Sequence, residues 1–369
     1  MATLHHSLLA AAALLPLAPG VALAETAPQQ GTLSYKYLDY QDRQPGEDRV
    51  GIKAHALALT VPLGESWSFD ANAVTDAVSG ASPRYHTRRL TPLEDRRNAL
   101  GVGLTRYFAR GSLNVGGNYS KEADYLSRSF STTLTWFTDE GKNTALIAGA
   151  GVTRDEINPT NGIVAGERKA VVEVLAGVTQ VLTPADIAQV IVRHARGSGY
   201  YSDPYKAWDE RPRERNASTL LLRWNHHLDA TDASVRTSYR FYTDSFGLRA
   251  HTLGLEFEQP LGAGWTVTPV LRLYSQNAAS FYVPYNPGPT GQTFPEPGAR
   301  YYTQDQRLSA FGAVTAGLKL AWQVNPAWSI DAKFEAYRQR GDWALQGRGD
   351  PGLAPFDARS VQLGVTHRF

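Results

Sequence analysis

Charged and polar residues recur at every second position in four segments of the C-terminal half. Alternate side chains of a β-strand point to the same face of the sheet, so each row would share one face. Rows of both charge signs can line a wet pore that selects ions or small solutes, or they can fill a barrel interior as a salt-bridge network, and both interpretations are open. The rows are Arg236, Arg240 and Asp244; Glu256 and Glu258; Arg272, Tyr274 and Gln276; and Asp331, Lys333 and Glu335.

A second group of candidate residues lies in two turn-rich stretches, at 76–83 and 199–208. The second stretch could fold into the lumen as a plug or contact a ligand, and Asp203-Pro204 in it is a turn signal. Asp203, Asp209 and Glu210 offer oxygen ligands for Ca²⁺, but their spacing matches no EF-hand, so a loop that pairs with itself is the alternative. The candidate contact residues are Asp76, Ser82, Asp203, Tyr205, Lys206 and Trp208.

The sequence lacks the residues of several common kinds of site. It contains no cysteine, which excludes disulfides, thiolate metal sites and cysteine nucleophiles. It also contains no Gly-x-Ser-x-Gly, His-Glu-x-x-His or P-loop motif, so we predict neither an enzyme nor a bound cofactor or metal. A formal net charge of +2 over 369 residues gives no bulk argument for nucleic acid as a partner.

The elements that would position the charged rows are strands. From residue 31 onward, segments of about 10–14 residues alternate in polarity, and short turns alternate with long connections. We count about 16 strands, which predicts an all-β, antiparallel, up-and-down transmembrane barrel with short periplasmic turns and long extracellular loops. Aromatic residues near the strand ends predict bands at the two membrane interfaces. They are Trp67, Trp136, Trp265, Trp322 and Trp328 near short turns, and Tyr40, Tyr201, Tyr242, Tyr282 and Tyr301 near long connections.

The last nine residues form an amphipathic strand pattern. Val361, Leu363 and Val365 alternate with polar residues or glycine, and Phe369 ends the sequence. This pattern resembles the C-terminal signal by which outer-membrane barrels are recognised for insertion, so we expect the barrel assembly machinery and outer-membrane lipid as partners. If the apolar parity faces lipid, the charged rows face the lumen. In a closed barrel, 361–369 would pair with 32–40 and leave no edge.

The N-terminus predicts export. Residues 8–24 are rich in leucine and alanine and carry no charge, and Ala22-Leu23-Ala24 forms a small-x-small cleavage pattern before Glu25. We therefore expect a cleaved signal peptide at 1–24, a single barrel domain at 25–369, and a location in the bacterial outer membrane.

Several segments resemble a family of uncharacterised bacterial proteins, domain-of-unknown-function family 3570. The resemblance lies in DAVSGASP at 76–83, GYYSDPYK at 199–206, Arg211-Pro212, YRFYTDSFG at 239–247 and LRLYSQNAASFY at 271–282. It implies an outer-membrane β-barrel and no established activity.

Two hypotheses for function follow from these patterns. The first is porin-like passage or binding of small solutes through a charged lumen. The second is a non-transport surface barrel whose loops bind a partner or scaffold an envelope complex. An outer-membrane hydrolase with a site assembled across strands is a third hypothesis, because fold does not decide function.

Overall fold

A computed structural model describes residues 26–44, 47–81, 92–206, 208–284, 295–347, 349–350 and 352–369. The predicted signal peptide and Ser82 lie outside these residues. The described part of the chain holds no helix that is long and apolar enough to cross a membrane. Two short 3₁₀ helices, Gln306–Leu308 and Gly341–Trp343, follow β15 and β17.

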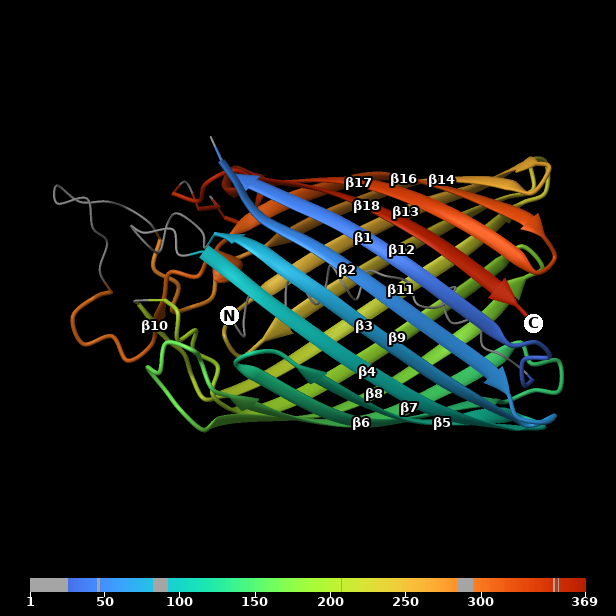
Figure 1. Cartoon of the computed structure of the whole chain (residues 1–369), viewed down its shortest axis with the longest axis horizontal. Helices are drawn as coiled ribbons and strands as arrows, with labels where there is room; N and C mark the ends of the chain where they lie inside the picture. The colour runs from blue at the N-terminus through green and yellow to red at the C-terminus, as the bar shows by residue number, and fades with distance from the viewer. Residues whose placement is uncertain are drawn as a thin grey trace.

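Sixteen antiparallel strands of the described residues form one closed barrel, as the sequence predicts (Figure 1). Two further short strands, β10 (Asp209–Glu210) and β15 (Tyr302–Thr303), form a separate small sheet among the long loops. The barrel strands are β1 (Thr32–Gln44), β2 (Glu47–Pro62), β3 (Trp67–Ala81), β4 (Pro92–Phe108), β5 (Gly111–Lys121), β6 (Tyr125–Phe137), β7 (Thr144–Ile157), β8 (Glu167–Thr183), β9 (Asp186–Gly199), β11 (Glu214–Leu228), β12 (Ala233–Asp244), β13 (Arg249–Gly262), β14 (Trp265–Gln276), β16 (Phe311–Asn325), β17 (Trp328–Arg340) and β18 (Phe356–Arg368).

The first and last strands close the barrel. β1 pairs with β18 from Thr32 opposite Arg368 onward, and the Ser34 and Thr366 hydroxyls lie 2.9 Å apart. The N–H of Phe369 donates to the carbonyl of Gly31 at 3.0 Å, and a Cβ at Gly31 would lie 2.5 Å from the Phe369 ring. The predicted pairing of the two ends is confirmed. Because no edge is left, every strand satisfies its backbone groups within the barrel.

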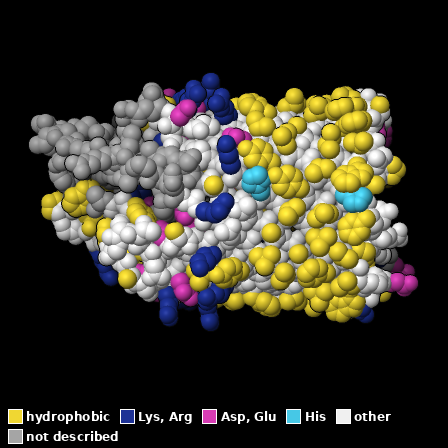
Figure 2. All heavy atoms as spheres, in the orientation of Figure 1, with side chains coloured by type: hydrophobic (Ala, Val, Ile, Leu, Met, Phe, Trp, Pro, Cys, Tyr) yellow, Lys and Arg dark blue, Asp and Glu magenta, His cyan; other side chains and the backbone are white. Residues whose placement is uncertain are grey.

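The outer surface carries a broad apolar band (Figure 2). Its members occupy one parity of each strand, such as Leu100 in β4, Phe130 in β6 and Leu363 in β18, and all three are at least half exposed. Soluble monomers rarely expose a contiguous apolar surface of this extent, whereas a barrel in lipid requires it. The parity of Val361 and Leu363 therefore marks the lipid-facing side.

Only one of the two predicted aromatic bands occurs as expected. Trp67, Trp136 and Trp328 are exposed near the short turns, and Trp265 stacks on Trp322 with ring centroids 5.2 Å apart. The predicted tyrosine band is wrong, because most of its members point inward. The reason is their hydroxyl groups, which reach buried carboxylates: Tyr40 donates to Asp42, Tyr242 to Asp244 and Tyr282 to Asp350.

The strands beside one long connection reach further than the sequence indicates. Residues 77–97 read as one polar connection, yet β3 continues to Ala81 and β4 begins at Pro92. Asp76 and Arg97 are register partners in these two strands, so polar residues here belong to the inward face of the sheet. The lumen-facing parity is polar, which makes the end of a strand hard to distinguish from a loop.

Candidate functional site: a charged lumen beneath a packed mouth

The predicted charged rows of β12 and β13 lie on the inward parity. Arg236 is the register partner of Glu256, while the neighbouring pair Thr237 and Leu255 faces outward. The Arg236 guanidinium lies 3.0 Å from the carboxylate of Glu258 and 3.9 Å from that of Glu256. The side chains of Arg236 and Glu256 are 45% and 43% exposed although they face the interior. This part of the lumen is therefore open to water.

The rows of β14 and β17 continue the same wall. Lys333 contacts Glu335 at 2.9 Å, and Asp331 contacts Lys36 of β1 at 3.8 Å across β18. Arg272 lies between the outward residues Leu271 and Leu273, on the inward parity. The C-terminal wall thus holds side chains of both signs, partly paired with each other.

The charged wall extends further than the sequence analysis indicated. Glu173 of β8 contacts Arg193 of β9 at 3.3 Å, and the Arg193 side chain is 50% exposed inside the barrel. Arg223 of β11 donates to Gln189 at 3.0 Å. The sequence could have indicated these residues, because they alternate with the apolar residues Val172, Val174 and Val192. Those valines lie on the same outward side as the apolar residues of the terminal strand.

At the long-loop end, a buried ion network joins two of the long loops. Arg211 donates through Nε and Nη2 to Asp209 at 2.7 and 2.6 Å, and through Nη2 to Asp305 at 2.8 Å. Thr303 of β15 donates to Asp209 at 2.6 Å, so the network joins the loop after β9 to the loop after β14. Arg307 bridges Asp305 and Asp203. We call these five charged residues and Thr303 the mouth network.

Neighbouring cations hold the buried carboxyl of Asp305 ionised. Burial by itself opposes ionisation of Asp305, but the cations of Arg307, Lys206 and Arg211 lower the pKa of its carboxyl well below the ordinary value. The same burial lowers the pKa of the Lys206 amine. Buried charges persist only when they are paired and hydrogen-bonded, and here each carboxylate meets at least one cation.

An apolar cluster packs beside the mouth network. Phe246, Leu248, Ala279 and Leu308 are buried together, with Tyr201 packed against them. The ring of Phe246 meets Tyr201 edge-on at 5.8 Å. Tyr201 comes from the loop after β9, Phe246 and Leu248 from the loop between β12 and β13, and Ala279 and Leu308 from the connection between β14 and β16, so three loops pack together in one layer.

Below this layer, inward ion pairs join neighbouring strands at the long-loop end. Asp76 and Arg97 are directly opposite in β3 and β4 and lie 3.0 Å apart. Three more pairs repeat the arrangement around the barrel: Asp42 with Arg49, Asp155 with Lys169, and Asp244 with Arg215. Asp244, expected to line the lumen, is thus a buried member of the mouth.

The predicted loop-contact residues are mostly inside the molecule. Asp76 lies within β3 rather than at the start of a loop, and Asp203 is a buried member of the mouth network. Tyr205 donates to Asp124 at 2.5 Å. Among the candidates in the described residues, Trp208 is the exposed one, with its ring 6.4 Å from that of Tyr302. The loop at 199–208 therefore folds into the mouth. Of the three carboxylates in the Ca²⁺ hypothesis, Asp203 is held by Arg307 and Asp209 by Arg211, while Glu210 is exposed.

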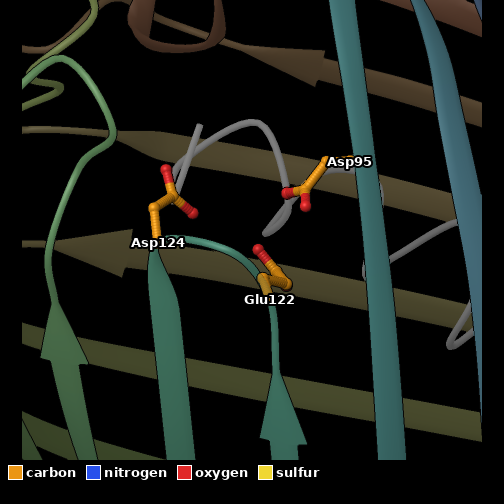
Figure 3. A group of neighbouring side chains, drawn as sticks. All are labelled: Asp95, Glu122 and Asp124. Atoms are coloured by element: carbon orange, nitrogen blue, oxygen red, sulfur yellow. The ribbon is translucent and has the colours of Figure 1, made fainter.

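Three buried carboxylates meet beside the mouth network. Asp95, Glu122 and Asp124 turn toward one another, with an oxygen of each within 4.8 Å of the others (Figure 3). Burial, together with the charges of Asp95 and Asp124, raises the pKa of Glu122 to about 8. At neutral pH, Glu122 therefore holds a proton, and this relieves the repulsion among the three groups. A carboxylate cluster alone does not make a metal site, and we assign none.

Comparison with solved structures shows the fold. The chain resembles a bacterial polysaccharide outer membrane secretin, with 10% identity and a TM-score of 0.52 over 92% of this chain and 98% of that one. It also resembles the siderophore receptor PirA from Pseudomonas aeruginosa, with 10% identity and a TM-score of 0.46 over 91% and 80%. OccD3 (OpdP) of the same organism matches at 8% identity and a TM-score of 0.45 over 93% and 92%. No curated protein sequence matches the chain.

The closed barrel and its apolar outer band mark a bacterial outer-membrane protein. A family model described as "Protein of unknown function (DUF3570)" matches residues 84–166 and 161–359, which is more than half of the chain. The chain belongs to this family.

Proposed function

We propose that the protein passes small polar or charged solutes across the outer membrane, and that the conformation described here is its closed state. The observation that carries the proposal is the water-exposed charge inside the barrel. Arg193 of β9 and Arg236 of β12, whose strands are separated only by β11, are half exposed although both point inward. A barrel interior filled for stability alone would bury such side chains in pairs, as the mouth does.

The smooth early wall supports passage as well. Gly101, Gly103 and Gly116 of β4 and β5 face inward together with Asn114 and Asn118, and these short side chains leave room opposite the charged strands. A lumen with charged side chains on one side and small polar groups on the other would bind a solute weakly enough to release it.

The packed mouth favours a second candidate, a surface barrel that transports nothing. Its loops join through the mouth network and the apolar cluster around Phe246, as a fixed platform for a partner would. The two candidates differ in whether the mouth network opens.

Conductance in planar lipid bilayers tests the proposal. The natural chain should show rare or small openings, and the double variant Arg211→Ala, Arg307→Ala should conduct steadily, because it removes both cations that bind Asp305. The matched control is Arg213→Ala, which removes a cation from an exposed pair with Glu167. Glu256→Gln, Glu258→Gln in the opened variant should shift selectivity toward anions.

Heat-modifiable gel mobility first establishes that each variant is a closed barrel. A closed double variant that gives no conductance overturns passage and supports the surface barrel. Steady conductance by the natural chain contradicts the closed state but retains passage.

A further inference from the structure

Outward-facing cations form a belt along the long-loop edge of the apolar band. Figure 2 shows Lys and Arg side chains as dark-blue groups beside the apolar surface. We call these exposed residues the cation belt: Lys53, Arg96, Lys121, Arg128, Arg154, Arg168, Arg196, Arg249, Arg338 and Arg359. The whole chain has a formal net charge of only +2, so the belt reflects placement rather than a generally basic composition.

The belt lies at the depth of lipid headgroups. Moving along β6 toward the long loops, the outward residue that follows Phe130 is Arg128. In β18 the outward residue that follows Val361 in the same direction is Arg359. One outward step is two residues, or about 7 Å along a strand. The headgroup layer on each side of the hydrocarbon core is roughly 5–8 Å thick, so these guanidinium groups reach it from the last apolar residues.

The highest local charge occurs on β6, β7 and β8. Arg128 and Arg154 are direct register partners, and like charges directly opposite each other destabilise a sheet. Glu156 contacts Arg128 at 3.1 Å and is the register partner of Arg168. Arg154 and Arg168 make no ion pair with a carboxylate of the described residues, which leaves two positive charges uncompensated on this patch.

The short-turn end of the band has a different arrangement. There Arg106 lies over the ring of Trp67 at 4.9 Å, and Arg110 lies over Trp136 at 5.8 Å. These arginines contact aromatic faces of the protein itself. The arginines of the cation belt at Arg128, Arg154 and Arg168 instead lie side by side on neighbouring strands of the long-loop side, which in an outer-membrane barrel is the outer leaflet.

We propose that the cation belt binds the phosphate groups of an anionic lipid of the outer leaflet, most strongly at Arg128, Arg154 and Arg168. A guanidinium matches a phosphate with two parallel hydrogen bonds, and three arginines on adjacent strands can hold one phosphorylated headgroup. Bound phosphate would also relieve the repulsion between Arg128 and Arg154.

Native mass spectrometry of the refolded full chain in detergent tests this proposal, with bisphosphorylated lipid A as the probe. Arg154→Gln, Arg168→Gln should weaken binding by about 10- to 30-fold, given the energy of two cations at a charged lipid surface. The matched control Arg106→Gln, Arg110→Gln removes two outward cations at the other end of the band and should bind as the natural chain does.

A second measurement needs no variant. The natural chain should prefer bisphosphorylated lipid A over the phosphate-free lipid by at least the same factor. Equal binding of the two lipids, or an equal loss in the control variant, would overturn the proposal.

Discussion

Arg211 holds two buried carboxylates at once, Asp209 and Asp305, and its side chain is itself buried. Removing such a buried arginine destabilises the protein mainly because it leaves a buried carboxylate without its cation. A lone buried carboxylate keeps its desolvation cost and loses its counter-charge. The closed mouth therefore depends on this residue more than on any of the exposed surface pairs nearby.

We expect Arg211→Ala to destabilise the closed mouth by about 3–5 kcal/mol, because it leaves the buried Asp209 without a cation and leaves Asp305 with Arg307 alone. Arg213→Ala, in an exposed pair, should cost under about 1 kcal/mol. Hydrogen exchange of residues 200–211 and 302–308 measures both. Equal exchange in the two variants would show that Arg211 does not hold the loops together.

The Asp95, Glu122 and Asp124 cluster predicts a pH dependence of mouth stability. The pKa of Glu122 is about 8 in the folded protein, raised from 4.5. Between these two values, unfolding of the loop releases a proton, so stability falls as pH rises from about 4.5 to about 8 and then levels off. The loops of the mouth should therefore be more stable against local unfolding at pH 5 than at pH 9.

Glu122→Gln should flatten this dependence, since the amide keeps the shape of a protonated carboxyl and has no proton to release. The readout is hydrogen exchange at 122–124 and 200–206, corrected for the intrinsic effect of pH. The account fails if the natural chain and the variant respond to pH alike.

At the scale of elements, the alternation of apolar and polar side chains along each strand predicted most of the fold. The terminal strand, with Val361 and Leu363 outward, set a phase that placed Arg236, Glu256 and Lys333 on the lumen side of strands far away. That inference works because adjacent strands share one inside and one outside. The even number of strands and the closure of β1 on β18 followed from the same regularity.

The mouth could not be read from the sequence in this way. Arg211 meets Asp305 across 94 positions, and no periodic pattern links two loops. The tyrosines were misplaced for a related reason, since a Tyr beside a loop suits a membrane interface and a buried carboxylate equally well. The position of a side chain such as Tyr205 is set by a hydrogen bond to a residue of another loop, Asp124. Only the folded chain shows that partner.

The outward phase predicts a sharp contrast between neighbouring residues of β14. Leu271 faces lipid, so Leu271→Arg should cost about 2–4 kcal/mol in a barrel refolded into vesicles. Arg272→Gln, on the lumen side, should cost far less. Urea unfolding followed by tryptophan fluorescence measures both, and a larger loss for Arg272→Gln would reverse the assignment of faces.

Barrel closure predicts a specific cross-link. The chain has no cysteine of its own, and Ser34 and Thr366 are register partners. Ser34→Cys, Thr366→Cys should oxidise readily in the folded protein, since paired residues in antiparallel strands approach within disulfide range. Ser34→Cys, Ser360→Cys, six residues out of register, should not. A cross-link in the second variant alone would refute the β1–β18 register.

At the scale of the whole molecule, the barrel has two ends of different character. The short-turn end opens onto a wet, charged lumen, where Arg236 and Glu256 are partly exposed. The long-loop end holds the mouth network, which joins two long loops, and carries the cation belt on its outside. We therefore propose that solute passage is regulated at the mouth and that the cation belt sets the depth of the barrel in the outer leaflet.

The proposed passage of solutes requires a lumen that contains water at mid-depth. Labelling of single cysteines by a charged maleimide in lipid vesicles tests it directly, with Ser238→Cys on the inward face of β12 and Thr237→Cys, its outward neighbour, as the control. We predict fast labelling at 238 and little at 237. Equally slow labelling at both positions would show a dry, packed interior and contradict the account.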